Sequence, residues 1–152
     1  MTPRAQELVA TLGLAPHPEG GFYREVHRTS TPPGVRPAST LIYFLLVRGQ
    51  FSRWHRVDAE ETWHFYEGSP LELFRGEEEI TRVLLGRLGS EATPWAVVPA
   101  GVWQAARPVG DYALLGCQVA PGFDFRGLEM LADDPARAEA FRARHPRYAS
   151  LI

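Results

Sequence analysis

Two histidines and a glutamate with a spacing that could do chemistry lie in one stretch of the chain, SRWHRVDAEETWHFYEG, residues 52–68. They are His55, Glu61 and His64, which supply two imidazoles and one carboxylate. Imidazole changes its charge near neutral pH, and it is also a common ligand of metal ions. The stretch is therefore compatible with a metal site, with a catalytic pocket that needs no metal, and with a barrel core that merely contains polar residues.

The spacing within this stretch predicts which side chains share a face. In a regular strand that runs from Glu61 onward, Trp63 shares the face of Glu61, whereas His64 and Tyr66 point outward or into an interface. A β-bulge would be needed to turn His64 toward Glu61. The simplest structural explanation of His55 and Glu61 is an ion pair or a hydrogen bond in a core. Because such a buried pair is costly unless it is used, we favour a functional pocket.

Other side chains are candidates for ligand binding. Arg24, in the segment PHPEGGFYRE at residues 16–25, has a planar fork that suits an anionic group. A surface ion pair between Arg24 and Glu25 is the alternative explanation. Trp63 and Trp103 have flat rings that can stack on a base or a sugar, and core packing is the alternative for both.

Composition narrows the possible functions. The chain has 152 residues, with 16 basic and 18 acidic side chains, a net charge of −2 and a single cysteine. Every basic residue is arginine, which excludes a lysine Schiff base and a GK[ST] phosphate loop. There is no clustered basic face for nucleic-acid binding and no apolar run as long as a membrane span. Because the start of the chain lacks a signal-peptide pattern, we expect a cytoplasmic protein whose partner is a small molecule.

The elements that must position the candidate residues are short strands between two helices. Thr2, followed by proline, begins a helix that Gly13 ends, and Asp134, also followed by proline, begins a second helix of about ten residues. Between the helices, runs such as STLIYFLLV, LELFRG and YALLGCQVA are separated by glycine and proline turns. This pattern predicts an all-β sandwich or barrel with a short helix at each terminus, in one domain over residues 1–152.

The glycines around His55 complete a longer pattern. Gly49, His55, Val57, Glu61 and Gly68 have the spacing G-x5-H-x-V-x3-E-x6-G. This pattern resembles the first motif of the cupin superfamily, in which a histidine stands at the position of the valine. The resemblance implies that the side chain of His55 points into a barrel together with a glutamate from the next strand.

A second pattern lies downstream, where VPAGVWQA contains Pro99, Gly101 and Gln104. It resembles the centre of the second cupin motif, with glutamine at the histidine position. Together with PHPEGGFYRE, WHRV, ETWHFYEG and APGFDF, these words are similar to the cupin type 5 family, a domain of unknown function. The resemblance implies a double-stranded β-helix (jelly-roll) barrel, a pocket in its mouth and a homodimer. It implies no particular substrate.

The cupin metal site implied by the resemblance is depleted in this chain. Val57 cannot bind a metal, and Gln104 offers only a neutral amide oxygen. The remaining set of His55, Glu61 and Gln104, with His64 if a bulge turns it inward, would make a weak site for a first-row divalent metal. We therefore expect either a weakly bound divalent metal or none.

Three functions are compatible with these residues. The first is a metal-independent isomerase or epimerase. In it, His55 removes a proton from the substrate, Glu61 orients the ring of His55, and Tyr66 or Tyr43 returns a proton. The second is a metal-dependent dioxygenase or isomerase that uses His55 and Glu61 with Gln104. The third is a binding module that holds a small polar metabolite without changing it.

Overall fold

The computed structural model describes residues 1–89 and 91–152, and strands dominate this part of the chain. The strands are β1 (Ala15–Pro16), β2 (Phe22–Arg28), β3 (Thr40–Val47), β4 (Ser52–Val57), β5 (Glu60–Gly68), β6 (Leu71–Arg75), β7 (Thr81–Leu85), β8 (Trp95–Val98), β9 (Gln104–Pro108), β10 (Tyr112–Ala120) and β11 (Leu128–Met130). The helices are α1 (Pro3–Leu12) and α2 (Pro135–Arg144), with the 3₁₀ helices η1 (Phe125–Gly127), η2 (Leu131–Asp133) and η3 (Pro146–Leu151).

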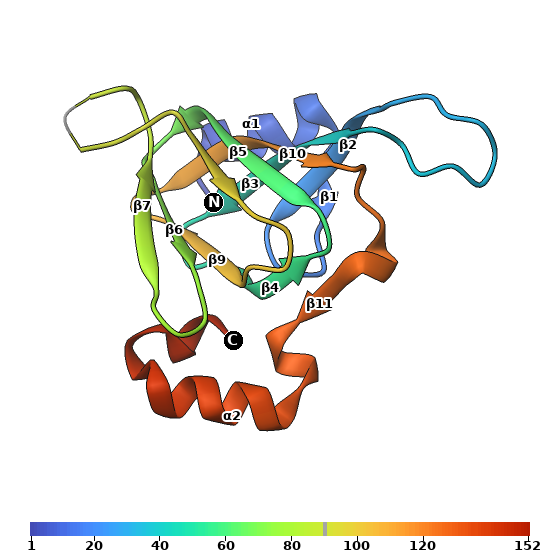
Figure 1. Ribbon diagram of the computed structural model, residues 1–152. Helices are drawn as coiled ribbons and strands as arrows, with labels where there is room; N and C mark the ends of the chain where they lie inside the picture. The colour runs from blue at the N-terminus through green and yellow to red at the C-terminus, as the bar shows by residue number, and fades with distance from the viewer. Residues whose placement is uncertain (90) are drawn as a thin grey trace.

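The strands form two antiparallel sheets that face each other (Figure 1). One sheet has six strands in the order β1-β2-β3-β10-β5-β8, and the other has five in the order β11-β4-β9-β6-β7. Neighbours in each sheet are mostly far apart in the sequence, as in a jelly roll. The prediction of an all-β, double-stranded β-helix barrel with a helix at each end is confirmed.

The N-terminal helix begins and ends where its sequence signals predict. The hydroxyl of Thr2 accepts the backbone N–H of Ala5 at 3.3 Å, which caps the first turn. At the other end Gly13 adopts a left-handed conformation, with φ 61°, and its N–H bonds the last carbonyls. The buried Ala5 and Leu8 then pack on the outer face of the six-stranded sheet, against Leu45 and its neighbours.

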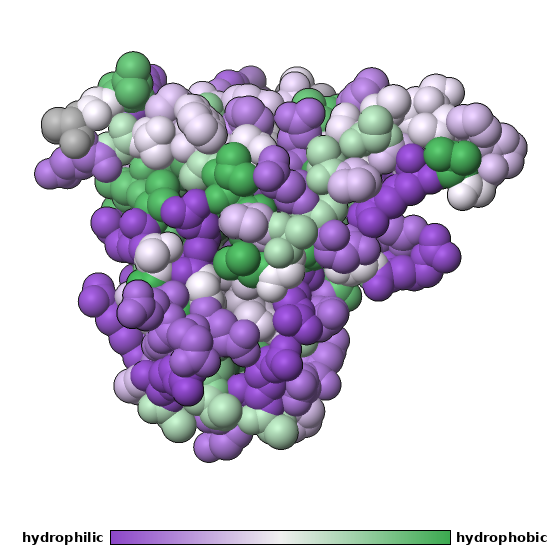
Figure 2. Space-filling view, viewed as in Figure 1, coloured by the Kyte–Doolittle hydropathy of each residue, from purple (hydrophilic) through white to green (hydrophobic). Residues whose placement is uncertain are grey.

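The C-terminal helix covers the outer face of the five-stranded sheet (Figure 1). Its N-cap is Asp134, whose carboxylate accepts the N–H of Arg137 at 3.0 Å. The apolar side of α2 carries Ala138 and Phe141, which pack against Trp54 of β4. The outward side of α2 is largely hydrophilic (Figure 2). Within the described ranges, neither this helix nor any other has the length and apolar character that crossing a membrane requires.

The interior between the sheets is apolar at one end and polar at the other. The apolar end contains the buried side chains of Phe44, Leu46, Trp63, Leu71, Leu73, Leu85, Ala96, Val98, Ala106, Ala113, Leu115 and Cys117. The polar end contains the buried polar residues of the described part of the chain, which are Glu19, Thr40, Ser52, His55, Glu61 and Gln104. The candidate site therefore lies at one end of the barrel interior.

Candidate functional site

Alternation along three strands brings the motif residues together inside the barrel. On β4, His55 and Val57 point inward, and on β5 Glu61 and Trp63 do the same. His55 lies directly opposite Gln104 of β9 in the strand register. Each of these side chains is at least 93 % buried, with His55 and Gln104 1 % exposed and Glu61 7 % exposed. The sequence motifs thus predicted a set of residues that the fold does bring together.

These residues surround a small cavity at the polar end of the barrel. It is lined by His17, Glu19, Tyr23, Thr40, Ile42, His55, Val57, Glu61, Cys117, Val119 and Phe123. Its volume is about 30 Å³, which is room for a water molecule or two. A metabolite can therefore enter only if part of this lining moves.

The nearest ionisable side chain to the ring of His55 is that of Glu19, which sequence reasoning missed. The imidazole Nε2 of His55 lies 3.1 Å from Oε2 of Glu19. The hydroxyl of Ser52 donates to the other oxygen of Glu19 at 2.8 Å. On the far side of the ring, Nδ1–H of His55 donates to the carbonyl of Arg53 at 2.6 Å. Because a carbonyl oxygen can only accept, this bond places the proton of the neutral ring on Nδ1, and the lone pair of Nε2 faces Glu19.

A tight turn brings Glu19 into the barrel. Gly20 has φ 113°, and a Cβ at this position would collide with the carbonyl oxygen of Phe51. Only glycine can therefore hold this close approach. The ring of His17 supports the same turn, because its Nδ1 accepts the backbone N–H of Glu19 at 3.2 Å. The two glycines of the segment PHPEGG indicate a turn beside Glu19. They do not indicate that this turn lies next to His55.

Burial determines the charges in the cluster. Desolvation raises the pKa of Glu19 to about 8, and it raises the pKa of Glu61 to about 7. Desolvation also lowers the pKa of His55, although the carboxylate of Glu61 opposes this by favouring the imidazolium. At neutral pH the stable arrangement is therefore a neutral imidazole that accepts a hydrogen bond from the protonated Glu19.

The other buried carboxyl is oriented by a chain of hydrogen bonds. The indole Nε1–H of Trp63 donates to Oε1 of Gln104 at 2.9 Å, and Nε2 of Gln104 donates to Oε2 of Glu61 at 2.7 Å. An indole N–H can only donate, so it determines which end of the amide faces Glu61. Gln104 is therefore a hydrogen-bond donor to the carboxyl, and Trp63 is a positioning residue rather than a stacking platform.

The residues present do not fit the metal site of a cupin. Val57 has no ligand atom, and the amide oxygen of Gln104 is occupied by the indole of Trp63. The lone pair of His55 Nε2 is directed at Glu19. Among the residues that the structure describes, no three side chains of His, Cys, Asp or Glu are arranged to hold an ion. The donor set thus supports proton exchange better than coordination of a metal.

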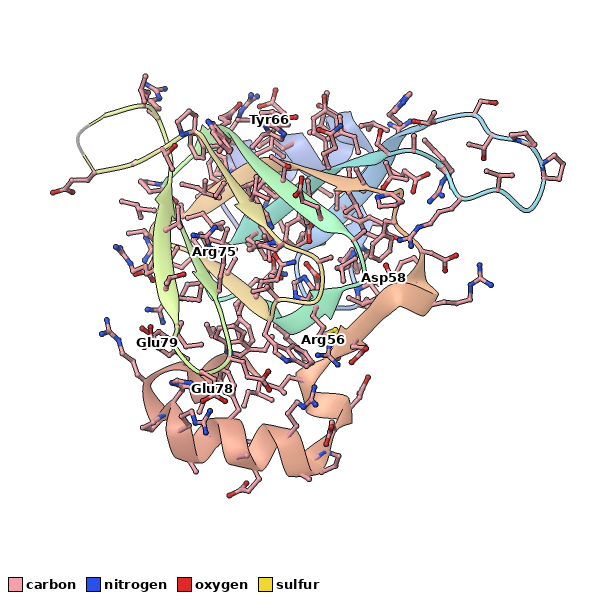
Figure 3. The ribbon with its side chains drawn as sticks, viewed as in Figure 1. Arg56, Asp58, Tyr66, Arg75, Glu78 and Glu79 are labelled. Carbon is pink, nitrogen blue, oxygen red and sulfur yellow. The ribbon has the colours of Figure 1, made fainter. Side chains whose placement is uncertain are left out.

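Two side chains proposed for the site from the sequence lie outside the barrel. His64 is paired with Trp95 on the outer face of the six-stranded sheet, and no bulge in the register with β8 turns it inward. Tyr66 is 46 % exposed, and its ring packs edge-on against Tyr43, with 6.0 Å between the centroids. In Figure 3, Tyr66 lies far from Arg56, the neighbour of His55 on β4. The expected roles of His64 as a metal ligand and of Tyr66 or Tyr43 as the acid opposite His55 are corrected on this ground.

The positions of Arg24 and Trp103 also correct the expectations. The guanidinium of Arg24 donates to the carbonyl of Leu12 at 3.1 Å, at the end of α1, because alternation on β2 turns its neighbour Tyr23 toward the cavity. Trp103 is buried on the outer side of the five-stranded sheet, under the guanidinium of Arg56 at 4.8 Å. Neither side chain lines the cavity, so the structure does not bring Arg24 or Trp103 together with His55.

Comparison with solved structures supports this description of the fold. A protein from Shewanella oneidensis is similar, with 33 % identity and a TM-score of 0.84 over 97 % of this chain and 94 % of that chain. A hypothetical protein from Leishmania major has 29 % identity and a TM-score of 0.81 over 97 % of this chain and 96 % of that chain. A dTDP sugar isomerase from Desulfovibrio desulfuricans has 12 % identity and a TM-score of 0.56, with 78 % and 85 % covered, which shows likeness of fold alone. No curated protein matches the chain.

The family is shown by a match over most of the sequence. The model of the family Cupin_5, described as "Cupin superfamily (DUF985)", matches residues 6–131. This range includes most of α1, all the strands and every residue that lines the cavity. The similarity to the Shewanella structure covers the same elements at 33 % identity. The chain therefore belongs to the Cupin_5 family of the cupin superfamily.

Proposed function

We propose that this protein binds a small polar metabolite at the mouth of the barrel and moves a proton on it without a metal, as an isomerase or epimerase does. One observation carries the proposal: His55 Nε2 lies 3.1 Å from the buried carboxyl of Glu19. The pKa of Glu19 is about 8 and that of the nearby Glu61 about 7. Groups with pKa values near the working pH are the ones that transfer protons efficiently.

The roles of the side chains follow from their protonation. A ligand that enters the cavity displaces the bond between Glu19 and His55, and Nε2 of His55 then accepts a proton from a carbon next to a carbonyl. The electron pair of the C–H bond moves to the carbonyl oxygen, which takes a proton from the carboxylic acid of Glu19. When the deprotonated carbon carries a hydroxyl, the product is an enediol. The imidazolium of His55 then gives its proton to the former carbonyl carbon, and the hydroxyl on the neighbouring carbon returns a proton to the carboxylate of Glu19. This completes an isomerisation in which both groups regain their starting protonation and no electron is gained or lost. Glu61, held by Gln104, stabilises the imidazolium.

The distant structural neighbours support the proposal only in general terms. The dTDP sugar isomerase shows that a barrel of this fold can accompany isomerase chemistry. Its substrate is not transferred to this chain, because 12 % identity supports the fold alone. The proposal rests on the cluster of His55, Glu19 and Glu61.

A deuterium experiment tests proton transfer while the substrate is still unidentified. Mixtures of sugars, sugar phosphates and 2-oxo acids would be incubated with the protein in D2O at neutral pH and followed by mass spectrometry. We expect at least one compound to gain one mass unit, and we expect the His55→Gln variant to slow that exchange by about 10²–10⁴-fold. His27→Gln is the matched control, because His27 is exposed on β2.

The same experiment separates the competing functions. If no compound exchanges but one of them stabilises the protein against heat and is recovered unchanged, the protein is a binding module. Elemental analysis after dialysis addresses the metal-dependent enzyme. Metal in proportion to protein that is lost in a His55→Ala variant would favour that enzyme over the proposal.

The homodimer and the cytoplasmic location stay predictions. If the dimer forms, the outer face of the six-stranded sheet is the place to test, because Trp95 there is 56 % exposed and Tyr66 46 % exposed. Light scattering of the wild type and of a Trp95→Arg variant would check this. A dimeric wild type and a monomeric variant would support a homodimer through that face.

A further inference from the structure

A second, open hollow adjoins the cavity, and we call it the arginine groove. It is lined by Arg28, Gly34, Val35, Arg36, Pro37, Asp58, Gly122, Phe123, Asp124, Arg126 and Gly127. Its volume is about 480 Å³, against about 30 Å³ for the cavity. Phe123 belongs to the lining of both spaces, and we call it the partition. The groove is thus a ready space for the part of a ligand that the cavity cannot hold.

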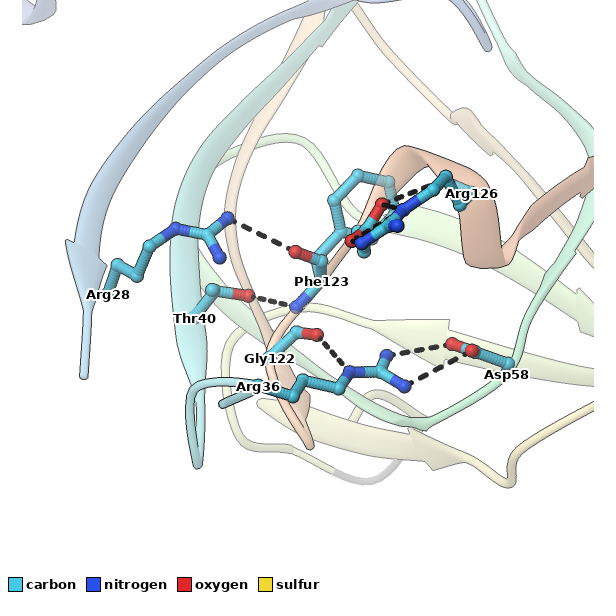
Figure 4. A network of polar contacts seen from close by, with 8 residues as sticks. Arg28, Arg36, Thr40, Asp58, Gly122, Phe123 and Arg126 are labelled. Atoms are coloured by element: carbon cyan, nitrogen blue, oxygen red, sulfur yellow. Dashed lines mark hydrogen bonds and ion pairs between the residues drawn. The ribbon is translucent and has the colours of Figure 1, made fainter. Parts of the chain in front are cut away.

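Three arginines from three separate segments line the groove, and each is bonded to a different partner (Figure 4). Arg28 ends β2, pairs with the carboxylate of Glu25 at 2.8 Å and donates to the carbonyl of Phe123 at 3.1 Å. Arg36, from the loop after β2, donates to the carbonyl of Gly122 at 2.8 Å and pairs with Asp58. Arg28 and Arg36 thus bind the backbone of Gly122 and Phe123. Arg126 extends into solvent, with 90 % of its side chain exposed.

Asp124 already places a carboxylate among these arginines. Its carboxylate accepts Nη2 of Arg126 at 2.7 Å and the backbone N–H of Arg126 at 2.9 Å. The guanidinium of Arg126, helped by the charge of Arg36, holds the pKa of Asp124 well below its usual range. Because the pair joins residues only two positions apart, it can open without breaking contacts between strands. Asp124 is therefore a local stand-in for an anion from outside.

We propose that the arginine groove binds a phosphate or carboxylate group of the ligand in the place of the Asp124 carboxylate, with the rest of that ligand passing Phe123 into the cavity. Planar guanidinium groups match both anions, and several of them converging on one group make a selective site. The inference rests on the proposed function, because it assigns the substrate of the His55 cluster to the class of small anionic metabolites.

The way in which the Phe123 segment is held connects binding in the groove to opening of the cavity. Phe123 is held through its backbone, whose N–H donates to the hydroxyl of Thr40 at 2.9 Å and whose carbonyl accepts from Arg28. Its ring also packs edge-on against Phe125, with 5.0 Å between the centroids. An anion that draws Arg28 away from this carbonyl loosens the segment that closes the cavity. Binding in the groove would thus favour opening of the cavity.

Inorganic pyrophosphate and succinate, titrated by calorimetry at low salt, test the anion site. We expect Asp124→Asn to strengthen binding by about threefold, because the internal competitor is removed, and Arg126→Gln to weaken it by about as much. The matched controls are Asp111→Asn and Arg48→Gln, an exposed pair on another part of the surface. They should leave binding unchanged. Tighter binding of pyrophosphate than of succinate would identify a phosphate group, and the reverse a carboxylate.

Failure of both anions to bind, or equal effects of Asp124→Asn and Asp111→Asn, would show that the groove is not an anion site. His55→Gln should leave pyrophosphate binding unchanged, because His55 does not line the groove. Loss of deuterium exchange and loss of pyrophosphate binding are therefore separate results, and each bears on one proposal only.

The single cysteine of the chain tests the connection between the two spaces. Cys117 lines the cavity and is 2 % exposed, so its reaction with methyl methanethiosulfonate reports access to the cavity. We expect Phe123→Ala to accelerate this reaction at least about tenfold under native conditions, where the free energy of unfolding is measured in parallel to exclude global opening. Labelling at the wild-type rate in Phe123→Ala would contradict a route past Phe123.

Discussion

The two ends of the barrel interior contain side chains of opposite character, apolar at one end and polar at the other. At the apolar end, Leu71, Leu73 and Leu85 are 0 % exposed and contact other apolar side chains. At the polar end, His55 and Glu19 are buried almost as deeply, yet burial opposes the charged form of each. The apolar end therefore stabilises the fold, whereas the buried polar groups at the other end reduce its stability. A polar end of this kind is the expected place for function.

The largest expected effect is at the apolar end. Replacing Leu73 by alanine should lower the free energy of unfolding by about 2–5 kcal/mol, because it removes buried methyl groups and leaves a cavity. Urea denaturation measures this, and Leu88→Ala is the control, because Leu88 is 83 % exposed. A loss below about 1 kcal/mol would mean that the apolar end is not the stabilising half.

A smaller effect is expected where a polar chain is interrupted. Gln104→Met conserves the volume but leaves the indole of Trp63 and the carboxyl of Glu61 without a partner. We expect stability to fall by about 1–3 kcal/mol and the pKa of Glu61 to rise further. The control is Gln118→Met on the exposed side of β10. Equal stabilities of the two variants would show that the chain of hydrogen bonds does not hold the site.

The pH dependence of stability should expose the cost of the polar end. The pKa values of Glu19 and Glu61, about 8 and about 7, lie above their ordinary value of 4.5. The folded protein therefore keeps protons that the unfolded chain has released, and stability falls as the pH rises toward those values. His17 and His55, whose pKa values are lowered by burial, act in the opposite direction only below about pH 6.5.

Between pH 6.5 and 8 we thus expect the wild type to lose roughly 1–2 kcal/mol of stability. Glu19→Gln should remove the larger part of this loss, since the amide does not titrate. Urea denaturation at several pH values measures it, with the exposed Glu60→Gln as the control. A wild type that becomes more stable over this range would contradict the assignment of a neutral Glu19.

The smallest effect is expected for Tyr66→Phe. This side chain lies outside the barrel, so the rate of deuterium exchange and the free energy of unfolding should stay within about twofold and about 0.5 kcal/mol of the wild type. Deuterium exchange followed by mass spectrometry and urea denaturation measure these two quantities. A loss of exchange comparable to that of His55→Gln would return Tyr66 to the role that sequence reasoning gave it.

Features that depend on neighbouring residues were predicted well. Thr2, Gly13 and Asp134 bound the two helices as expected, because caps act within one turn. The spacing from Gly49 to Gly68 brought His55 and Glu61 into one barrel. Parity along β5 placed His64 and Tyr66 outside, and the same rule applied to β2 would have placed Arg24 outside as well.

Caps and alternation, which are local, were thus enough to predict the helix ends and an all-β chain, and the resemblance to cupins added the jelly-roll barrel and the pair of His55 and Glu61. The protonation of that pair depends on burial and on contacts between distant segments, which are visible only in the tertiary structure. Glu19 reaches His55 from a turn far away in the chain, and the amide of Gln104 is oriented by an indole on another strand. Burial and the choice of hydrogen-bond partner, which set the pKa values, arise only when distant segments pack together.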